Sequence, residues 1–136
     1  MTAVVLDASA TGAILLPDEE GAMREHVLRA TREHDLHVPA IWAAEIASLT
    51  INAFRRKRLG PEDLMRVCAQ ADLFRRTAII APDPPTHVVV GLAREFGLSA
   101  YDASYAVLAL ELSATLLTGD SKLRIAAPRI GIELFA

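Results

Sequence analysis

The sequence contains a single cysteine, Cys68, among its 136 residues. One cysteine cannot form an intramolecular disulfide, and it excludes a zinc or redox site built on a Cys-x-x-Cys pair. No apolar run approaches the roughly 18 residues that a membrane-spanning helix needs. The chain enters an apolar run at Val4 without a basic segment or a cleavage site, so we expect no signal peptide. These absences predict a cytoplasmic protein that does not bind membranes.

The chain also lacks the basic excess that is typical of nucleic-acid-binding modules. Its 14 Lys and Arg residues stand against 17 Asp and Glu residues, for a net charge of −3. Basic residues do gather at positions 55–58 and 75–76. The run at 55–58 suits the last turn of a helix, where a solvated face and contact with a nucleic-acid backbone both stay open. Metal ions held by acids would reduce the negative charge that a substrate meets. Charge therefore neither supports nor excludes a nucleic-acid substrate.

Several catalytic motifs are missing. There is no P-loop, and Ser9 lacks the G-x-S-x-G elbow of a serine hydrolase. Ser9 also stands where a dehalogenase-like phosphatase needs a second acid after Asp7, and Asp83 fits the acceptor position of a receiver domain poorly. No histidine shows an H-E-x-x-H or similar zinc spacing; the four are His26, His34, His37 and His87. A soft-metal site and these enzyme classes are disfavoured.

The pattern of apolar residues indicates one α/β domain that spans residues 1–136. Hydrophobic residues make up 52% of the chain and charged residues 23%, as in globular proteins. Short apolar runs predict strands at 4–6, 37–38, 78–80, 115–117 and 130–135. Helical patterns cover 8–16, 23–33, 39–57, 61–74, 86–96, 99–112 and 121–126, with Pro39 opening the third. Brief apolar strands separated by helices imply a parallel sheet covered on both faces. We therefore expect a three-layer α/β/α sandwich with about five strands.

Two acids follow expected strands directly. Asp7 comes after the first strand, and Asp120 comes after the fourth, behind Gly119, whose lack of a side chain permits close backbone approach. Ligands of open α/β sheets gather beyond the carboxyl ends of the strands, so both are candidate site residues. Asp is also among the best helix N-caps, and capping explains either residue equally well when each is taken alone.

Two further acids lie in expected helices among apolar residues. Glu45 shares the apolar stripe that contains Ile41 and Leu49, and an ion pair with an arginine is the structural alternative. Asp102 is the only charged residue between Ala100 and Leu110, so this helix reads as buried nearly all round. A carboxylate removed from water is costly unless something pairs with it, and that favours a functional role for both.

The four acids Asp7, Glu45, Asp102 and Asp120 together predict a site for a hard divalent cation. Converging carboxylates repel one another and raise each other's pKa unless a cation neutralises them. Mg²⁺ prefers oxygen ligands and keeps several waters while taking a few carboxylates. Such a site can deprotonate water and stabilise charge on a phosphoryl group. The residues alone therefore point to hydrolysis of phosphate esters.

Four segments resemble the successive motifs of PIN-domain ribonucleases, in order and over nearly the whole chain. They are Val5-Leu6-Asp7-Ala8-Ser9, the segment Pro39 to Glu45, Leu98-Ser99-Ala100-Tyr101-Asp102-Ala103-Ser104-Tyr105, and Leu117-Thr118-Gly119-Asp120-Ser121-Lys122-Leu123. The Tyr-Asp-Ala segment and the Thr-x-Asp-x-Lys-Leu segment are the most specific. The sequence is most similar to the VapC-type toxins of bacterial and archaeal toxin–antitoxin pairs.

This resemblance implies a Mg²⁺- or Mn²⁺-dependent endoribonuclease with Asp7, Glu45, Asp102 and Asp120 as its catalytic and metal-binding acids. Ser9 and Thr118 match polar positions near the metal, where they hold waters or orient an acid rather than attack the phosphate. The family also implies an RNA substrate, a homodimer and a cognate antitoxin protein. One departure concerns an Asn that such toxins often carry shortly after the helix Glu, where this chain has Ser48 or Asn52.

Two other functions stay open on the sequence. A PIN nuclease that matures RNA without being a toxin would share all of this chemistry. A catalytically silent PIN-like module for dimerisation or binding would not need a complete set of acids, so the retention of all four argues against it.

Overall fold

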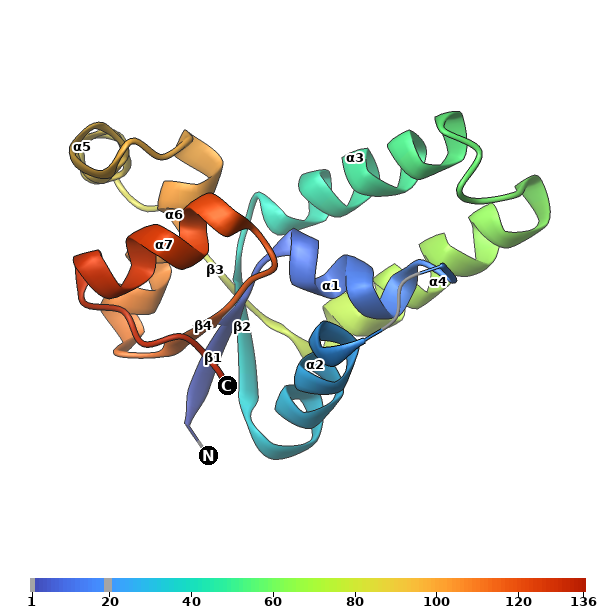
Figure 1. Cartoon of the computed structure of the whole chain (residues 1–136), viewed down its shortest axis with the longest axis horizontal. Helices are drawn as coiled ribbons and strands as arrows, with labels where there is room; N and C mark the ends of the chain where they lie inside the picture. The colour runs from blue at the N-terminus through green and yellow to red at the C-terminus, as the bar shows by residue number, and fades with distance from the viewer. Residues whose placement is uncertain (1, 19–20) are drawn as a thin grey trace.

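A parallel sheet with helices on both sides forms the centre of the protein (Figure 1). The computed structural model describes residues 2–18 and 21–136. In this part of the chain the sheet has four strands in the order β3-β2-β1-β4, with β1 at Ala3–Leu6, β2 at Asp35–Pro39, β3 at Ile79–Ala81 and β4 at Thr115–Leu117. Val5 pairs with His37 of β2 and Leu116 of β4. β1 is thus an inner strand, and its alignment with β4 brings two distant strand ends together.

The helices complete three layers, which confirms the predicted α/β/α sandwich. In Figure 1, α1, α2 and α4 lie on one side of the sheet, and α6 and α7 lie on the other. Helices α3 and α4 project away from the sheet as a hairpin. The bounds are α1 Ala8–Leu15, α2 Ala22–Glu33, α3 Trp42–Arg55, α4 Pro61–Thr77, α5 Thr86–Phe96, α6 Ala100–Leu112 and α7 Ser121–Ile130. No helix of the described residues is long and apolar enough to cross a bilayer.

The core forms where the inner strands meet the helix layers. Val4, Val5 and Leu6 of β1 are inaccessible to solvent, as are Leu116 and Leu117 of β4. A strand buried on both faces reads as a continuous apolar run, which is why these segments showed no alternation of polar and apolar residues. The apolar surface removed from water is the main force that holds β1 and β4 side by side.

A buried tryptophan joins the α3–α4 hairpin to the rest of the molecule. The Trp42 ring stacks on Phe74 of α4 with 5.8 Å between centroids, and its indole N–H donates to Thr11 Oγ1 at 3.1 Å. The Thr11 hydroxyl in turn donates to the Asp7 carbonyl at 2.9 Å. This chain of contacts fixes the start of α3 against α1, and with it the direction from which Glu45 approaches the sheet.

Three expected element boundaries are wrong. Pro39 ends β2, where it pairs with Ala81, and α3 begins only at Trp42. The expected fifth strand at 130–135 contributes a single parallel bridge between Leu134 and Leu116. Ile130 instead belongs to α7, which continues past Ala126 and contains Pro128. The chain reverses at Gly131, so too few residues remain alongside β4 to build a ladder.

Candidate active site

The ends of β1 and β4 lie side by side because the two strands are parallel neighbours. Leu6 pairs with Leu117, and the Asp7 N–H donates to the Leu117 carbonyl at 3.2 Å. The residues that follow each strand, from Asp7 on one side and from Thr118 on the other, therefore leave the sheet at the same point. This adjacency explains how groups separated by 111 positions in sequence come to form one hydrogen-bond network.

Asp7 is the most enclosed acid of the network, with 3% of its surface exposed. Its Oδ1 accepts from the Ala10 N–H at 2.9 Å and from the Ser9 hydroxyl at 2.8 Å, while its Oδ2 accepts from the Thr118 hydroxyl. Burial raises the pKa of Asp7 above its ordinary value, these donors oppose the shift, and the charge of Asp120 adds to it. Asp7 therefore caps α1 and also presents a buried carboxylate, so helix capping does not exclude a role in a site.

Thr118 and Ser9 connect Asp7 to the loop that carries Asp120. The Thr118 hydroxyl accepts from the Asp120 N–H at 3.0 Å, and the Ser9 hydroxyl accepts from the Gly119 N–H at 3.0 Å. Asp120 Oδ2 accepts from the Leu123 N–H at 2.9 Å and so caps α7. Each hydroxyl thus accepts a hydrogen bond from a backbone N–H of the loop that follows β4, and each donates a hydrogen bond to the Asp7 carboxylate.

Glu45 approaches the same region from α3 and is half-buried. Its Oε1 accepts a hydrogen bond of 2.6 Å from the hydroxyl of Tyr105 on α6. Burial raises the pKa of Glu45, the Tyr105 hydroxyl opposes that shift, and the charges of Asp7 and Asp102 raise the pKa further. Glu45 forms no ion pair with any described Lys or Arg, which removes the structural alternative for this residue.

Asp102 lies in the first turn of α6, where its N–H donates to the Ser99 hydroxyl at 3.0 Å. Burial raises its pKa, as do the charges of Asp120 and Asp7, whereas the Ser99 hydrogen bond and the charge of Lys122 lower it. Asp102 is only half-buried, because the buried part of α6 lies further along the helix. The expectation that this helix is buried nearly all round is therefore wrong at its start, which opens toward the other acids.

The structure brings all six predicted site residues to one region at the carboxyl end of the sheet: Asp7, Ser9, Glu45, Asp102, Thr118 and Asp120. Asp7, Ser9, Thr118 and Asp120 are joined by hydrogen bonds, and Glu45 and Asp102 are coupled to Asp7 through their charges. Three of the four acids have raised pKa values, so the folded chain does not neutralise their negative charge. Hard oxygen donors in this state fit a divalent cation.

The acids of the described residues do not form a closed protein cage for a metal ion. Among the described residues, no three His, Cys, Asp or Glu side chains are grouped closely enough to hold an ion by themselves. Mg²⁺ usually retains several waters and takes one or two carboxylates directly, so water can link the remaining acids to it. The donor set therefore suits Mg²⁺ or Mn²⁺ and disfavours metals that require dense coordination by nitrogen or sulfur.

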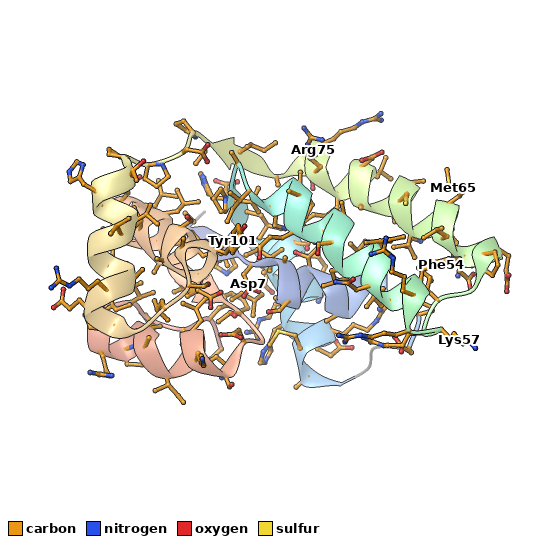
Figure 2. The ribbon with its side chains drawn as sticks, turned by 90° about the horizontal axis from the view of Figure 1, so that it is seen from above. Asp7, Phe54, Lys57, Met65, Arg75 and Tyr101 are labelled. Carbon is orange, nitrogen blue, oxygen red and sulfur yellow. The ribbon has the colours of Figure 1, made fainter. Side chains whose placement is uncertain are left out.

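A groove of about 470 Å³ opens beside these acids. Its walls come from α1, α3 and α6, and its lining residues are Ala8, Ser9, Ile41, Ala44, Glu45, Ser48, Leu49, Asn52 and Tyr101. In Figure 2, Tyr101 and Asp7 lie near the middle of the molecule, while Phe54 and Lys57 lie toward the far end of the α3–α4 hairpin. A substrate in the groove would reach Glu45 and Ser9 while it extends along α3.

Comparison with known proteins identifies the class. The PIN domain family model matches residues 4–127, so the chain belongs to the PIN-domain family. Its relatives include ribonuclease VapC9 of Mycobacterium tuberculosis, 39% identical over 125 residues that cover 88% of this chain and 87% of that protein. Ribonuclease VapC3 of Pyrobaculum aerophilum is 27% identical over 121 residues, which cover 88% of this chain and 91% of the relative. These matches confirm the resemblance found in the motifs.

Solved structures share the fold. PAE2754 from Pyrobaculum aerophilum has a TM-score of 0.69 and 26% identity, and covers 90% of this chain and 82% of its own. VapBC2 from Rickettsia felis, bound to a DNA fragment from its promoter, has a TM-score of 0.64 over 98% of this chain and 97% of its own. At 16% identity, the second match supports the fold alone.

One residue that contacts a predicted site acid was missed by the sequence reasoning. Tyr105 is 1% exposed and bonds Glu45, yet it was read only as part of a motif. The hydroxyl of a buried tyrosine usually forms a hydrogen bond with a polar partner. A tyrosine within an apolar helix therefore indicates a nearby polar group, and this was the signal in the sequence.

Proposed function

We propose that the protein is a Mg²⁺- or Mn²⁺-dependent endoribonuclease and the toxin of a VapBC-type toxin–antitoxin pair. The observation that carries this proposal is the convergence of four carboxylates from separate elements, whose charges oppose one another without a basic side chain paired to them among the described residues. The VapC ribonuclease relatives support RNA as the substrate class.

The cation would be held by the acids Asp7, Asp102, Asp120 and Glu45, one or two of them directly and the others through waters that complete its coordination. When bound, it supplies acidity to a water nucleophile and positive charge for the developing phosphoryl oxyanion. Ser9 and Thr118 hold the Asp7 carboxylate in one orientation. Glu45 lines the groove, so among the four acids it is the one placed to accept a proton from the attacking water at the substrate.

The groove supports a single-stranded RNA segment as the substrate. Ser48 and Asn52 line it beyond Glu45, and Arg55 follows on the same face of α3. Glu45 and Arg55 are ten residues apart, so the path between them is about 15 Å at 1.5 Å per residue. Tyr101 is 59% exposed beside the groove and offers a ring for base stacking.

The remaining parts of the proposal are a homodimer, an antitoxin partner and action in the cytoplasm. Ile79 and Ile80 of the edge strand β3 are exposed, which supports burial of this edge by a second copy of the chain. A mostly apolar groove of about 300 Å³ between α3 and α4, lined by Ile46, Leu64 and Cys68 among others, supports the docking of a partner segment. Light scattering of the purified chain, alone and with the product of the adjacent reading frame, tests both assemblies.

The nuclease proposal is tested with Asp102→Asn, because Asp102 is partly exposed and its removal leaves the buried Asp7 network in place. Cleavage of a single-stranded RNA with Mn²⁺ should fall at least 100-fold, since a cation-binding charge is lost. Glu111→Gln, which removes an exposed acid at the other end of α6, is the matched control and should cleave like the parent. Equal cleavage by D102N and the parent, or no Mn²⁺ binding by the parent in calorimetry, would contradict the proposal.

The toxin role is tested separately from the chemistry. Expression of the chain in a bacterial host should arrest growth, and co-expression of the adjacent reading frame should relieve the arrest. If active protein accumulates without arresting growth, the chain is an RNA-maturation nuclease instead.

A further inference from the structure

The hydroxyl of Tyr105 joins two helices. It belongs to the buried part of α6, and it donates to Glu45 Oε1 of α3 at 2.6 Å. Tyr105 is thus the contact through which α6 reaches the carboxylate of Glu45.

This contact satisfies a group that would otherwise lack a partner. A hydroxyl removed from water needs a hydrogen bond, and Tyr105 is almost fully buried. The Glu45 carboxylate is the acceptor that the structure provides for the Tyr105 hydroxyl.

Glu45 needs an external partner to stay beside the other acids. The charges of Asp7 and Asp102 repel its carboxylate, and the groove offers it a wet position away from them. A glutamate side chain has three rotatable bonds. The backbone of α3 does not fix these three torsions, so the carboxylate can move unless another group holds it. The Tyr105 hydrogen bond opposes the repulsion at the carboxylate itself.

We propose that Tyr105 is a positioning residue that holds the Glu45 carboxylate within the acid cluster, ready to bind the divalent cation. This inference rests on the proposed metal-dependent function and adds to it a residue that contacts neither the cation nor the substrate. The tyrosine acts through Glu45, so its contribution to cation binding requires the Glu45 charge.

The test measures Mn²⁺ affinity by calorimetry for the parent, Y105F, E45Q and the double variant Y105F/E45Q. Y105F should bind Mn²⁺ about 10-fold more weakly, as is usual when the hydrogen-bond partner of a ligand is removed. In the E45Q background the same substitution should have little effect. Glu111→Gln is the control, because it changes an exposed side chain at the other end of α6 and should leave Mn²⁺ affinity unchanged.

Crystal structures of the metal-free parent and Y105F give a second readout that does not depend on the cation. The Glu45 carboxylate should leave its position beside Asp7 and Asp102 in Y105F. An unmoved carboxylate, an unchanged Mn²⁺ affinity, or an equal loss of affinity in the E45Q background would overturn the inference. If the parent itself fails to bind Mn²⁺, the proposed function fails with it, and the crystal structures still report on positioning.

Thermal unfolding in EDTA confirms that each variant is folded. If Y105F does not fold, E45D replaces it, because its side chain is one methylene shorter and loses the Tyr105 hydrogen bond. E45D should then bind Mn²⁺ more weakly than the parent by a similar factor. Parent-like binding by E45D would overturn the inference.

Discussion

Replacement of Thr118 by valine should destabilise the protein and disable its site together. Thr118 is inaccessible to solvent, and valine preserves its shape while removing the hydroxyl. That hydroxyl donates to Asp7 Oδ2 and accepts from the Asp120 N–H. The variant therefore leaves a buried carboxylate oxygen without its donor and a backbone N–H without its acceptor.

The expected loss follows from these two contacts. A hydrogen bond to a charged group contributes about 1.5–3 kcal/mol, and a partly buried N–H left without a partner costs about 1 kcal/mol. The sum is about 3 kcal/mol of the free energy of unfolding. For a chain of this length it corresponds to a fall of about 10 °C in Tm. Cleavage should fall at least 10-fold, because Asp7 loses its orientation.

Urea unfolding in EDTA and RNA cleavage with Mn²⁺ measure the two effects. Thr118→Ser keeps the hydroxyl and should recover most of both, whereas Thr115→Val, on the strand that Thr118 follows, has no described side-chain hydrogen bond to lose and serves as the control. The reasoning is refuted if T118V lies within 0.5 kcal/mol of the parent, a margin of about the usual effect of surface substitutions, or if T115V loses as much stability.

Three further predictions concern charge and packing. Burial raises the pKa of Asp7 and Asp102, so in EDTA these acids destabilise the fold above their folded pKa values, and that cost is relieved as pH falls toward about 4. The Tm of the parent minus that of D102N should therefore increase as the pH is lowered from 7 to about 4, and a constant difference over that range would contradict the shift. Arg55→Glu should weaken single-stranded RNA binding and lower the slope of log affinity against log salt concentration by about 1, while Arg75→Glu on α4 should do neither. Equal losses of affinity in the two variants would show that RNA does not bind along α3. Trp42→Phe loses the hydrogen bond to α1 and should cost about 1–2 kcal/mol in urea unfolding, and a parent-like midpoint would show that this bond does not anchor α3.

The strand-end logic predicted Asp7 and Asp120 as site residues because the carboxyl ends of parallel strands share one edge of the sheet. That reasoning could not reveal that β1 and β4 are neighbours, since strand order depends on how the helices pack on each face. The sequence therefore could not predict that Thr118 joins Asp7 to Asp120 by hydrogen bonds. Helix capping and a site role do not exclude each other at Asp7, because Oδ1 caps α1 while Oδ2 accepts from Thr118.

Local propensity also gave wrong predictions for Pro39 and for the last strand, because tertiary contacts decide both. Proline suits the first turn of a helix and also the end of a strand, and only the pairing of Pro39 with Ala81 decides between them. The apolar residues at 132–135 have the composition of a strand, but Gly131 sets where the chain turns, and only Leu134 meets β4 in register. Tyr105 shows the same limit, because its hydrogen-bond partner Glu45 lies on another helix, 60 positions earlier in the sequence.

The hydrogen bond between Asp7 and Thr118 also sets the time at which the site can exist during synthesis. The two residues are separated by 111 positions, and Asp120 is the last of the four acids to be added to the growing chain. A nascent chain without β4 has an inner strand, β1, with one open edge and an Asp7 carboxylate that lacks its Thr118 donor. Because domains fold as units once their segments are available, the acid cluster assembles only after nearly all of the domain has been translated. A ribosome that makes this protein is therefore not exposed to a finished nuclease while most of the chain is still being added.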